Sequence, residues 1–184
     1  MKAVGVCGKI GSGKDVAADR LVEKHGYTKV QLSDLMAEEM EKKGIPVSRE
    51  AFQRFTQERK KESGKGVWAQ KAVEHIRENK IEKAVIVGIR DSAELPVFRK
   101  EFPGFKLVFI KASPETRLRR LVERGSRKDI TDLEDLARQE AREAEIFDIY
   151  ERYGEISDFT LENEGTIGEL QQRVDELAEK ENLL

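Results

Sequence analysis

Gly8-Lys9-Ile10-Gly11-Ser12-Gly13-Lys14-Asp15 is the stretch of sequence that decides the fold. It follows a short apolar run, Ala3 to Cys7, and precedes an amphipathic stretch, Lys14 to His25. Glycines remove Cβ atoms where backbone N–H groups must turn inward, and a helix N-terminus adds favourable partial charge for an anion. Because a strand precedes the loop and a helix follows it, the segment predicts a loop that wraps a polyphosphate.

The loop fits the pattern G-x-x-x-x-G-K, in which a lysine reaches the outer phosphates of a nucleotide as a point charge. That lysine is Lys14, and Asp15 stands where Ser or Thr usually supplies a ligand to Mg²⁺. A carboxylate serves the metal directly or through water, so we expect Asp15 at a metal site. The alternative is a glycine-rich turn that binds nothing. The predicted nucleotide-binding residues of the loop are Gly8, Gly11, Ser12, Gly13, Lys14 and Asp15.

Short apolar runs alternate with longer amphipathic stretches along the chain. This alternation is typical of a parallel sheet with helices on both faces, so the sequence predicts an α/β fold. The expected strands are Ala3 to Cys7, Tyr27 to Leu32, Ala84 to Val87, Phe105 to Ile110 and Phe159 to Leu161. The expected helices are Lys14 to His25, Leu35 to Lys43, Ser48 to Glu62, Val67 to Asn79, Pro114 to Arg124, Asp132 to Phe147 and Thr166 to Lys180, with a further one that carries Glu94.

Several of these helices begin with recognisable capping residues. Ser113 is an N-cap followed by proline at the first helical position. Thr131 with Glu134, and Thr166 with Glu169, each fit a capping box. The last helix carries one apolar stripe, made of Ile167, Leu170, Val174 and Leu177.

Length and composition limit the class of protein. At about 150 residues per domain, 184 residues predict one domain that spans 1–184. Lys and Arg number 34 against 36 Asp and Glu, a net charge of −2, so no strong field attracts nucleic acid or an anionic membrane. Cys7 is the only cysteine, which excludes an internal disulfide and a thiolate zinc cluster. No apolar stretch approaches the length of about 18 residues that spans a membrane, and we expect a cytoplasmic protein.

A carboxylate follows the second predicted strand. In a parallel sheet the carboxyl ends of the strands line the ligand crevice. Asp34 stands just past Tyr27 to Leu32, where it could accept a hydroxyl proton or hold an acceptor. A compatible alternative is that Ser33 or Asp34 caps the next helix.

An arginine follows the third predicted strand. Arg90 lies in Gly88-Ile89-Arg90-Asp91, directly after Ala84 to Val87, and offers a planar fork for a phosphate or carboxylate. Asp91 is a candidate cap for the helix that carries Glu94. An arginine at a strand end facing a phosphate loop indicates a ligand contact.

Three arginines share one face of the predicted helix Pro114 to Arg124. Arg117, Arg120 and Arg124 are spaced i, i+3, i+7, and they lead into the basic turn 125–129. Such charges usually form a solvated face, but a lid arginine would stabilise a transferring phosphoryl group and exclude water. The expected core side of this helix is Leu118, Leu121 and Val122.

Together these segments resemble the P-loop nucleotide and nucleoside kinases, most closely the group around dephospho-CoA kinase with its uncharacterised archaeal and bacterial relatives. Gly8 to Lys14 looks like that group's phosphate loop, and Gly88 to Asp91 with Glu94 looks like the GIR…E segment of the uncharacterised relatives. Ala112 to Arg117 and the following arginines look like the helix and lid. Ser157 to Thr166 resembles the ADYvIxNdGs signature. Bacteriophage deoxynucleoside-monophosphate kinase shares several of these features.

The resemblance implies a three-layer P-loop kinase fold, with a parallel five-stranded sheet flanked by helices and a small arginine-bearing lid at about 120–131. It implies that Gly11 to Lys14 hold the donor phosphates and that Lys14 neutralises developing charge. Asp15 departs from dephospho-CoA kinase, which has Ser there, but the phage kinase and animal phosphomevalonate kinases share the GKD form. The residues implied on or near the lid are Arg120, Arg124 and Arg127.

The same resemblance implies that Asn163 and Gly165 lie close to the adenine ring, although Asn163-Glu164-Gly165 is also an ordinary turn before a capped helix. The acceptor would bind the helical region of about 34–80, which departs from dephospho-CoA kinase and looks like the uncharacterised relatives. Arg59 is a candidate ligand for an acceptor phosphate. Trp68 either stacks on an acceptor base or fills the core.

We therefore expect an enzyme, a small-molecule kinase that moves the γ-phosphoryl group of ATP, with Mg²⁺, onto a nucleoside monophosphate or, as second candidate, dephospho-CoA. Catalysis would consist of positioning and charge neutralisation, with Lys14 and the metal on the donor and the lid arginines on the transferring group. Asp34 and Arg90 would act on the acceptor. A different reading is a module that senses ATP without turning it over. A kinase acting on nucleic acid is disfavoured by the balanced charge.

Overall fold

The computed structural model describes residues 1–46, 48–125, 130–149, 151–181 and 183. Its centre is a five-stranded parallel sheet with the order β2-β3-β1-β4-β5. The strands are β1 (Lys2–Cys7), β2 (Thr28–Gln31), β3 (Lys83–Val87), β4 (Lys106–Lys111) and β5 (Phe159–Glu162). The helices are α1 (Lys14–His25), α2 (Leu32–Lys42), α3 (Arg49–Ser63), α4 (Val67–Glu78), α5 (Glu94–Glu101), α6 (Pro114–Arg124), α7 (Leu133–Ile146), α8 (Tyr153–Ile156) and α9 (Ile167–Lys180).

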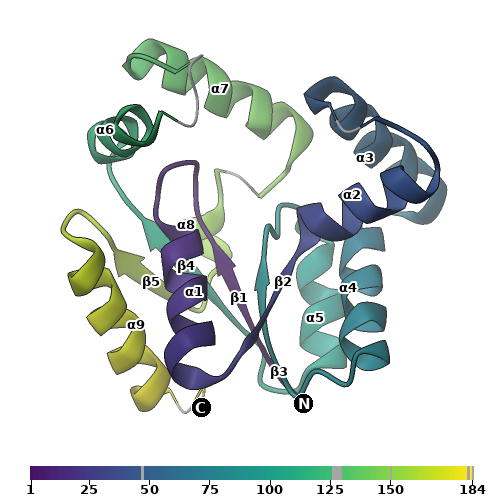
Figure 1. The fold of residues 1–184 in the computed structure, drawn as a ribbon, viewed down its shortest axis with the longest axis horizontal. Helices are drawn as coiled ribbons and strands as arrows, with labels where there is room; N and C mark the ends of the chain where they lie inside the picture. The colour runs from purple at the N-terminus through teal and green to yellow at the C-terminus, as the bar shows by residue number, and fades with distance from the viewer. Residues whose placement is uncertain (47, 126–129, 150, 182, 184) are drawn as a thin grey trace.

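Helices cover both faces of the sheet (Figure 1). Side chains alternate along a strand, so Val4 and Val6 of β1 pack toward α1 and α9, while Ala3 and Cys7 pack toward the opposite face, where α2, α4 and α5 lie. This arrangement buries both faces, which explains why the strands read as continuous apolar runs. The three-layer α/β fold with a parallel five-stranded sheet is confirmed.

The carboxyl ends of the strands carry the remaining helices. In Figure 1, α6 and α7 lie beyond this end of the sheet, above the loop that joins β1 to α1, and α2 and α3 lie beside it. A separate apolar cluster of Leu121, Ile130 and Leu136 joins α6 to α7, and Ile10 of the loop packs against it. The loop is therefore enclosed by elements from distant parts of the sequence.

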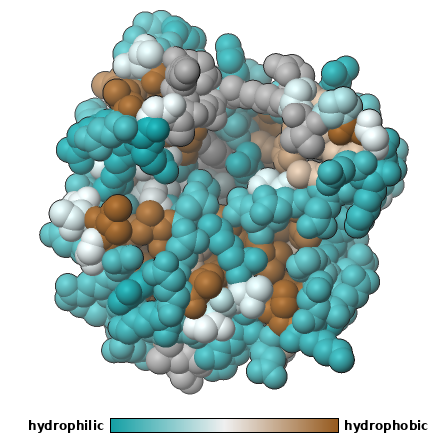
Figure 2. All heavy atoms as spheres, viewed as in Figure 1, coloured by the Kyte–Doolittle hydropathy of each residue, from teal (hydrophilic) through white to brown (hydrophobic). Residues whose placement is uncertain are grey.

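The surface is mostly polar, as the 38% of charged residues leads one to expect. Figure 2 shows hydrophilic side chains over most of one face, with hydrophobic ones in small separate groups. No helix within the described residues is long and apolar enough to cross a membrane.

Most predicted elements form close to the expected residues, but α2 begins earlier than expected. It starts at Leu32, directly after β2 ends at Gln31. Burial explains the shift, because Leu32, Met36 and Met40 recur every four residues and all face the core. Asp34 consequently lies inside the first turn of the helix, whose N-cap is Gln31, and the predicted cap by Ser33 or Asp34 is wrong.

Three further local predictions need correction. Helix α7 is capped by Asp132, whose side chain accepts from the Asp135 backbone N–H, and not by Thr131 with Glu134. Val122 is 55% exposed instead of buried, and Ile167 is 64% exposed at the start of the α9 stripe. The four-residue helix α8 was not predicted, because one turn carries too little periodicity to recognise. The N-cap Ser113 and the capping box of Thr166 with Glu169 are confirmed.

Candidate functional site

The loop between β1 and α1 has the backbone conformation of a phosphate cradle. Gly11 and Gly13 have φ of +78° and +94°, in the left-handed region that favours glycine, and Gly13 caps α1. A Cβ on Gly11 would lie 2.8 Å from the Arg117 carbonyl oxygen, and one on Gly13 would lie 2.5 Å from Nδ2 of Asn163. Glycine is therefore required at both positions, because another residue would be strained at these φ values and its Cβ would lie too close to neighbouring atoms.

Residues from α6 and α7 hold the loop in place. Arg117 is 3% exposed and donates to the carbonyl oxygens of Ile10 (3.3 Å) and Ala112 (3.1 Å). It also pairs with Glu140, which in turn accepts from Lys9 at 3.3 Å. Because its Nε and Nη1 groups are engaged with the protein, Arg117 fixes the loop.

The electrostatics of Lys14 and Asp15 suit a polyphosphate. Burial lowers the pKa of Lys14 from its ordinary value, and Asp15, whose carboxylate lies 3.4 Å from the ammonium group, opposes this effect. Burial also raises the pKa of Asp15, but the nearby Lys14 and Lys29 outweigh it and hold that pKa below its usual range. Asp15 is therefore ionised at neutral pH, as a Mg²⁺ ligand must be.

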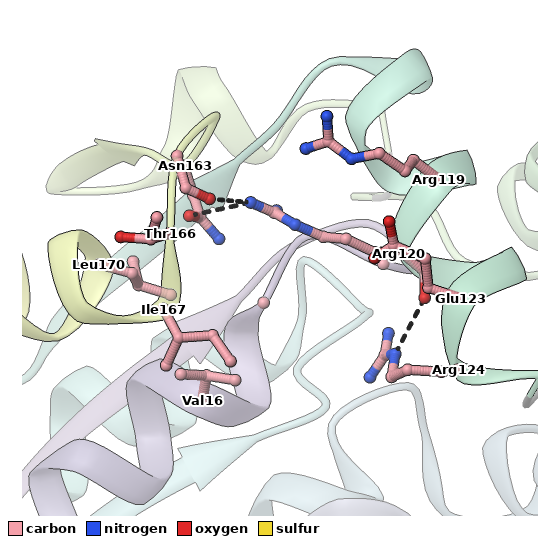
Figure 3. Close-up of a pocket in the computed structure, with 12 residues that line it drawn as sticks. Val16, Arg119, Arg120, Glu123, Arg124, Asn163, Thr166, Ile167 and Leu170 are labelled. Carbon is pink, nitrogen blue, oxygen red and sulfur yellow. Dashed lines mark hydrogen bonds between the residues drawn. The ribbon is translucent and has the colours of Figure 1, made fainter.

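One pocket, which we call the lid-side pocket, lies between α6 and the start of α9 and has a volume of about 300 Å³. Figure 3 shows Val16, Ile167 and Leu170 on one wall and the arginines of α6 on the other. A pocket with an apolar wall and a cationic wall is suited to a flat heteroaromatic ring with phosphates attached. The lining residues are Gly11, Gly13, Val16, Arg119, Arg120, Glu123, Arg124, Asn163, Gly165, Thr166, Ile167 and Leu170.

Arg120 crosses this pocket. Its Nη2 donates to the Gly165 carbonyl oxygen (2.9 Å) and to Oδ1 of Asn163 (3.3 Å), as Figure 3 shows. Its Nη1 is buried and has no hydrogen-bond partner among the described residues. A buried guanidinium N–H without a partner is costly, so Nη1 is the open position for a ligand oxygen or nitrogen.

Asn163 and Gly165 line the pocket as expected, but both are also engaged within the protein. Nδ2 of Asn163 donates to the Ser12 carbonyl oxygen at 2.7 Å, which ties the loop after β5 to the phosphate loop. Between them, the Glu164 carboxylate accepts from the Ser113 backbone N–H and hydroxyl and from the Thr116 hydroxyl, at 2.5 to 2.8 Å. The turn is therefore a fixed wall of the pocket, and its contact with a base stays a prediction.

A second pocket, the arginine pocket, lies on the other side of the loop and has a volume of about 210 Å³. Arg90 enters it from the end of β3 and pairs with Glu143 of α7, whose Oε2 lies 3.0 Å from Nη1. The other oxygen of Glu143 accepts from Nε2 of Gln139 at 3.0 Å. The lining residues are Cys7, Gly8, Ile10, Lys14, Gly88, Ile89, Arg90, Glu143 and Tyr153.

A third and narrower pocket, the tryptophan pocket, shares Gly88 and Arg90 with the arginine pocket. Lys60 of α3 pairs there with the buried carboxylate of Asp91. Glu94 accepts from the backbone N–H groups of Arg90 (2.8 Å) and Asp91 (3.1 Å), and burial raises the pKa of Glu94 to about 7. The lining residues are Gln31, Ser33, Met36, Phe52, Lys60, Trp68, Gly88, Arg90, Asp91, Glu94 and Phe147.

These pockets form a connected series through shared walls. A fourth pocket of about 220 Å³, the loop pocket, is lined by Lys14, Asp15 and Arg124 and shares Gly11 and Gly13 with the lid-side pocket. It also shares Lys14 with the arginine pocket. The series therefore runs from the lid-side pocket, past the phosphate loop, to the tryptophan pocket.

The structure brings most predicted site residues into this series. Gly8, Gly11, Gly13, Lys14, Asp15, Arg90, Arg120, Arg124, Asn163 and Gly165 all line one of the four pockets. Ser12 is buried in the loop, with its hydroxyl unpartnered among the described residues. Asp34 is exposed on α2 and lines a different pocket, together with Glu38 and Glu41. Arg127 lies outside the described residues.

Sequence reasoning did not single out several residues of the site. Glu143, Lys60, Arg119 and Gln31 line the pockets. Lys60 and Arg119 lie in segments expected as the acceptor region and the lid helix, but neither side chain was a candidate. Asp91 does not cap α5, whose N-cap is Ala93; it pairs with Lys60 instead. Such pairings join residues 31 or more positions apart, and no local pattern reveals them.

Comparison with known proteins shows the family of this chain. Residues 4–148 match the family model of an AAA domain. The chain is 32% identical to a "UPF0200 protein" of Methanothermobacter thermautotrophicus, over 98% of this chain and 90% of that protein.

Solved structures share the fold. A gluconokinase from Sinorhizobium meliloti has a TM-score of 0.60 and 18% identity, with 97% of this chain and 94% of that chain covered. A shikimate kinase from Acinetobacter baumannii, in complex with shikimate, has a TM-score of 0.59 and 17% identity, with 100% and 96% covered. The chain has the fold of these kinases, and it belongs to the AAA domain family, with the archaeal UPF0200 proteins as its relatives.

Proposed function

We propose that this protein is an ATP-dependent kinase that transfers the γ-phosphoryl group to a small-molecule acceptor. The observation that carries the proposal is the connected series of pockets, with Lys14 where the loop pocket meets the arginine pocket. A protein that bound a nucleotide without transferring its phosphate would need the lid-side and loop pockets alone. A second set of charged groups beyond Lys14, Arg90 with Glu143, is what a transferase requires for an acceptor.

The lid-side pocket is suited to the nucleoside of the donor. Its apolar wall, including the exposed Ile167, would contact the faces of the base. Arg120 Nη1, which lacks a partner among the described residues, would donate to the nucleotide. Asn163 and Gly165 would border the base edge, as the resemblance implies.

The loop would hold the phosphates. Its backbone N–H groups and the α1 N-terminus would bind the donor oxygens, and Lys14 would neutralise charge on the transferring group. Arg124, and by the resemblance Arg127, would approach the same group from the lid of about 120–131. Asp15 fits a Mg²⁺ ion, which keeps several waters and needs few protein ligands beside the phosphates. Bound there, the ion would shield the phosphate charges.

The acceptor would approach from the arginine pocket and the helical region of about 34–80. Arg90, which lines the arginine pocket, would contact it, while Asp34 would have to act from outside these pockets. The sequence favours a nucleoside monophosphate, which receives the phosphoryl group on a phosphate oxygen, over dephospho-CoA, which receives it on a hydroxyl.

The test is transfer from labelled ATP with Mg²⁺ to a panel of nucleoside monophosphates, nucleosides and dephospho-CoA. We expect one acceptor to be labelled and the transfer to be lost in Lys14→Ala. The exposed Lys100→Ala on α5 is the matched control and should behave as the unmodified protein. Tight ATP binding without labelling of any acceptor would favour a non-catalytic ATP sensor, and failure to bind ATP would contradict both functions.

A further inference from the structure

The charges around the acceptor side are already balanced within the protein. The described residues that line the arginine and tryptophan pockets include three basic side chains, Lys14, Lys60 and Arg90, and three acidic ones, Asp91, Glu94 and Glu143. Lys60 pairs with Asp91, and Arg90 pairs with Glu143. Since Lys14 serves the donor, these lining residues leave no surplus positive charge for an acceptor phosphate.

The basic residues nearby on α3 and α4 are paired as well. Arg59, the sequence candidate for an acceptor phosphate, contacts Glu39 and Glu62 at 2.9 Å each. Lys71 contacts the other oxygen of Glu39 at 2.9 Å. A dianionic phosphate entering here would have to break these pairs and would leave the largely buried Glu39 carboxylate without a partner, which is unfavourable.

The tryptophan pocket offers one hydrogen-bond donor and one acceptor that lack partners. Trp68 is fully buried, and its Nε1 has no hydrogen-bond partner among the described residues. The same holds for the buried amide oxygen of Gln31, which lines the same pocket. A hydroxyl group satisfies both, because it accepts from an indole N–H and donates to an amide oxygen.

The size of the pocket fits such a group. Its volume is about 20 Å³, and a cavity needs roughly 10–15 Å³ to hold one water molecule. This space is therefore on the scale of one hydroxyl group. The ring of Trp68 packs on Phe55, with centroids 6.0 Å apart, so the core fixes the position of Nε1.

We infer that the acceptor is an alcohol, that a hydroxyl of this acceptor binds Trp68 and Gln31, and that Glu143 takes the proton from the hydroxyl that is phosphorylated. This inference rests on the proposed function and narrows its acceptor class. The attacking oxygen forms a bond to the γ-phosphorus, the bond from that phosphorus to the bridging oxygen breaks, and ADP leaves. The proton passes to the Glu143 carboxylate, which Arg90 and Gln139 orient from either side.

The first experiment identifies the bond that is made. The protein is incubated with γ-labelled ATP and Mg²⁺ and with two acceptor sets, alcohols (dephospho-CoA, nucleosides, gluconate, shikimate) and the nucleoside monophosphates. We expect an acid-stable phosphomonoester on an alcohol. An acid-labile phosphoanhydride on a monophosphate would overturn the inference and leave the proposed function intact. No labelled product from either set would overturn both.

The second experiment tests the residues on the acceptor so identified. Glu143→Gln should lower kcat about 100-fold or more and leave the KM for ATP unchanged, whereas Glu145→Gln, exposed on the same helix, should change neither. A rise in activity in Glu143→Gln would mean that Glu143 only blocks Arg90, and it would overturn its role as base.

The contacts proposed in the tryptophan pocket are tested through the KM for the acceptor. Trp68→Phe and Gln31→Leu should each raise the KM for the acceptor about tenfold with ATP binding unchanged, while Gln70→Leu on the exposed side of α4 should not. Gln31→Leu serves where Trp68→Phe destabilises the fold. An unchanged acceptor KM in both variants would show that only water fills the pocket, and would overturn this contact.

Discussion

Gly13 shows how one residue joins the phosphate loop to the lid side of the site. It caps α1 in a left-handed conformation and lies against Asn163, whose amide holds the loop through the Ser12 carbonyl oxygen. Any side chain at this position would both strain the backbone and displace Asn163. Gly26, at the other end of α1, has a similar φ of +70° but nothing within 4 Å of an added Cβ.

Comparing variants of Gly13 and Gly26 separates the effect of backbone strain from the effect of displacing Asn163. We expect Gly13→Ala and Gly26→Ala each to cost about 1–2 kcal/mol of stability, because alanine is strained at positive φ. Only Gly13→Ala should also weaken ATP binding, by about tenfold or more, since it pushes Asn163 off the loop. Titration calorimetry with ATP and Mg²⁺ measures this, and equal affinities in the two variants would contradict the proposed loop contact.

Cys7 gives a second prediction at this scale. It is 1% exposed at the end of β1, and burial raises its pKa to about 12. At pH 8 the thiolate fraction is then on the order of one in ten thousand, so the folded protein should not react with a thiol reagent. In denaturant the single thiol should titrate fully. Rapid labelling of the folded protein would show that the end of β1 opens.

At the scale of elements, the sequence predicted what depends on local chemistry. Helices α6 and α9 begin directly after their N-caps, Ser113 and Thr166, because these side chains accept from backbone N–H groups three residues on. The loop could be recognised for the same reason. By contrast, the start of α2 is set by the burial of Leu32 in the tertiary core, and α7 contributes Glu143 through a pairing 53 positions from Arg90. Neither follows from a local pattern.

Helices α1 and α9 are joined by one carboxylate. Asp175 accepts from Arg20 at 2.6 and 3.0 Å and from Lys24 at 2.8 Å, and it lies 2.9 Å from Nε2 of His25. The hydrogen bonds from Arg20, reinforced by Lys24 and His25, hold the pKa of Asp175 far below its usual value of 3.8, although its burial acts in the opposite direction. This carboxylate is thus a point where charge fixes the packing of two helices.

Asp175→Asn should therefore lower the free energy of unfolding by about 2 kcal/mol at neutral pH. Because the folded pKa lies below the unfolded one, the contribution is complete above about pH 4 and declines as the pH falls further. Urea unfolding at neutral pH and near pH 3 should show the gap between the variant and the unmodified protein narrowing.

The control is Asp19→Asn on α1, which removes an exposed pair with Lys29 of β2. We expect a change below about 0.5 kcal/mol at either pH, because solvent screens exposed pairs. An equal loss of unfolding free energy in Asp175→Asn and Asp19→Asn would mean that the burial of Asp175 does not strengthen its ion pairs.

At the scale of the whole molecule, basic and acidic residues nearly cancel, and the described arginines and lysines pair widely with carboxylates. The net charge is −2, and even the arginine pocket contains a carboxylate. Proteins that bind nucleic acid through its backbone need an uninterrupted basic surface. From this charge distribution we predict that nucleic acid is not the acceptor.

We therefore expect no binding of a labelled single-stranded oligonucleotide at physiological salt, with a Kd weaker than about 10⁻⁴ M by fluorescence anisotropy. If a weak anisotropy signal remains and decreases at higher salt, we attribute it to the lid arginines alone. A tighter complex with a steep salt dependence would restore nucleic acid as an acceptor.

The connected pockets also predict how an inhibitor should be built. A single molecule with adenosine at one end and an alcohol at the other, joined by a chain of phosphates, would occupy all four pockets at once. Binding of the first end raises the effective concentration of the second, so such a bisubstrate compound should bind far more tightly than either half. Affinity should peak at one chain length, and that length would measure the path along the loop from donor to acceptor.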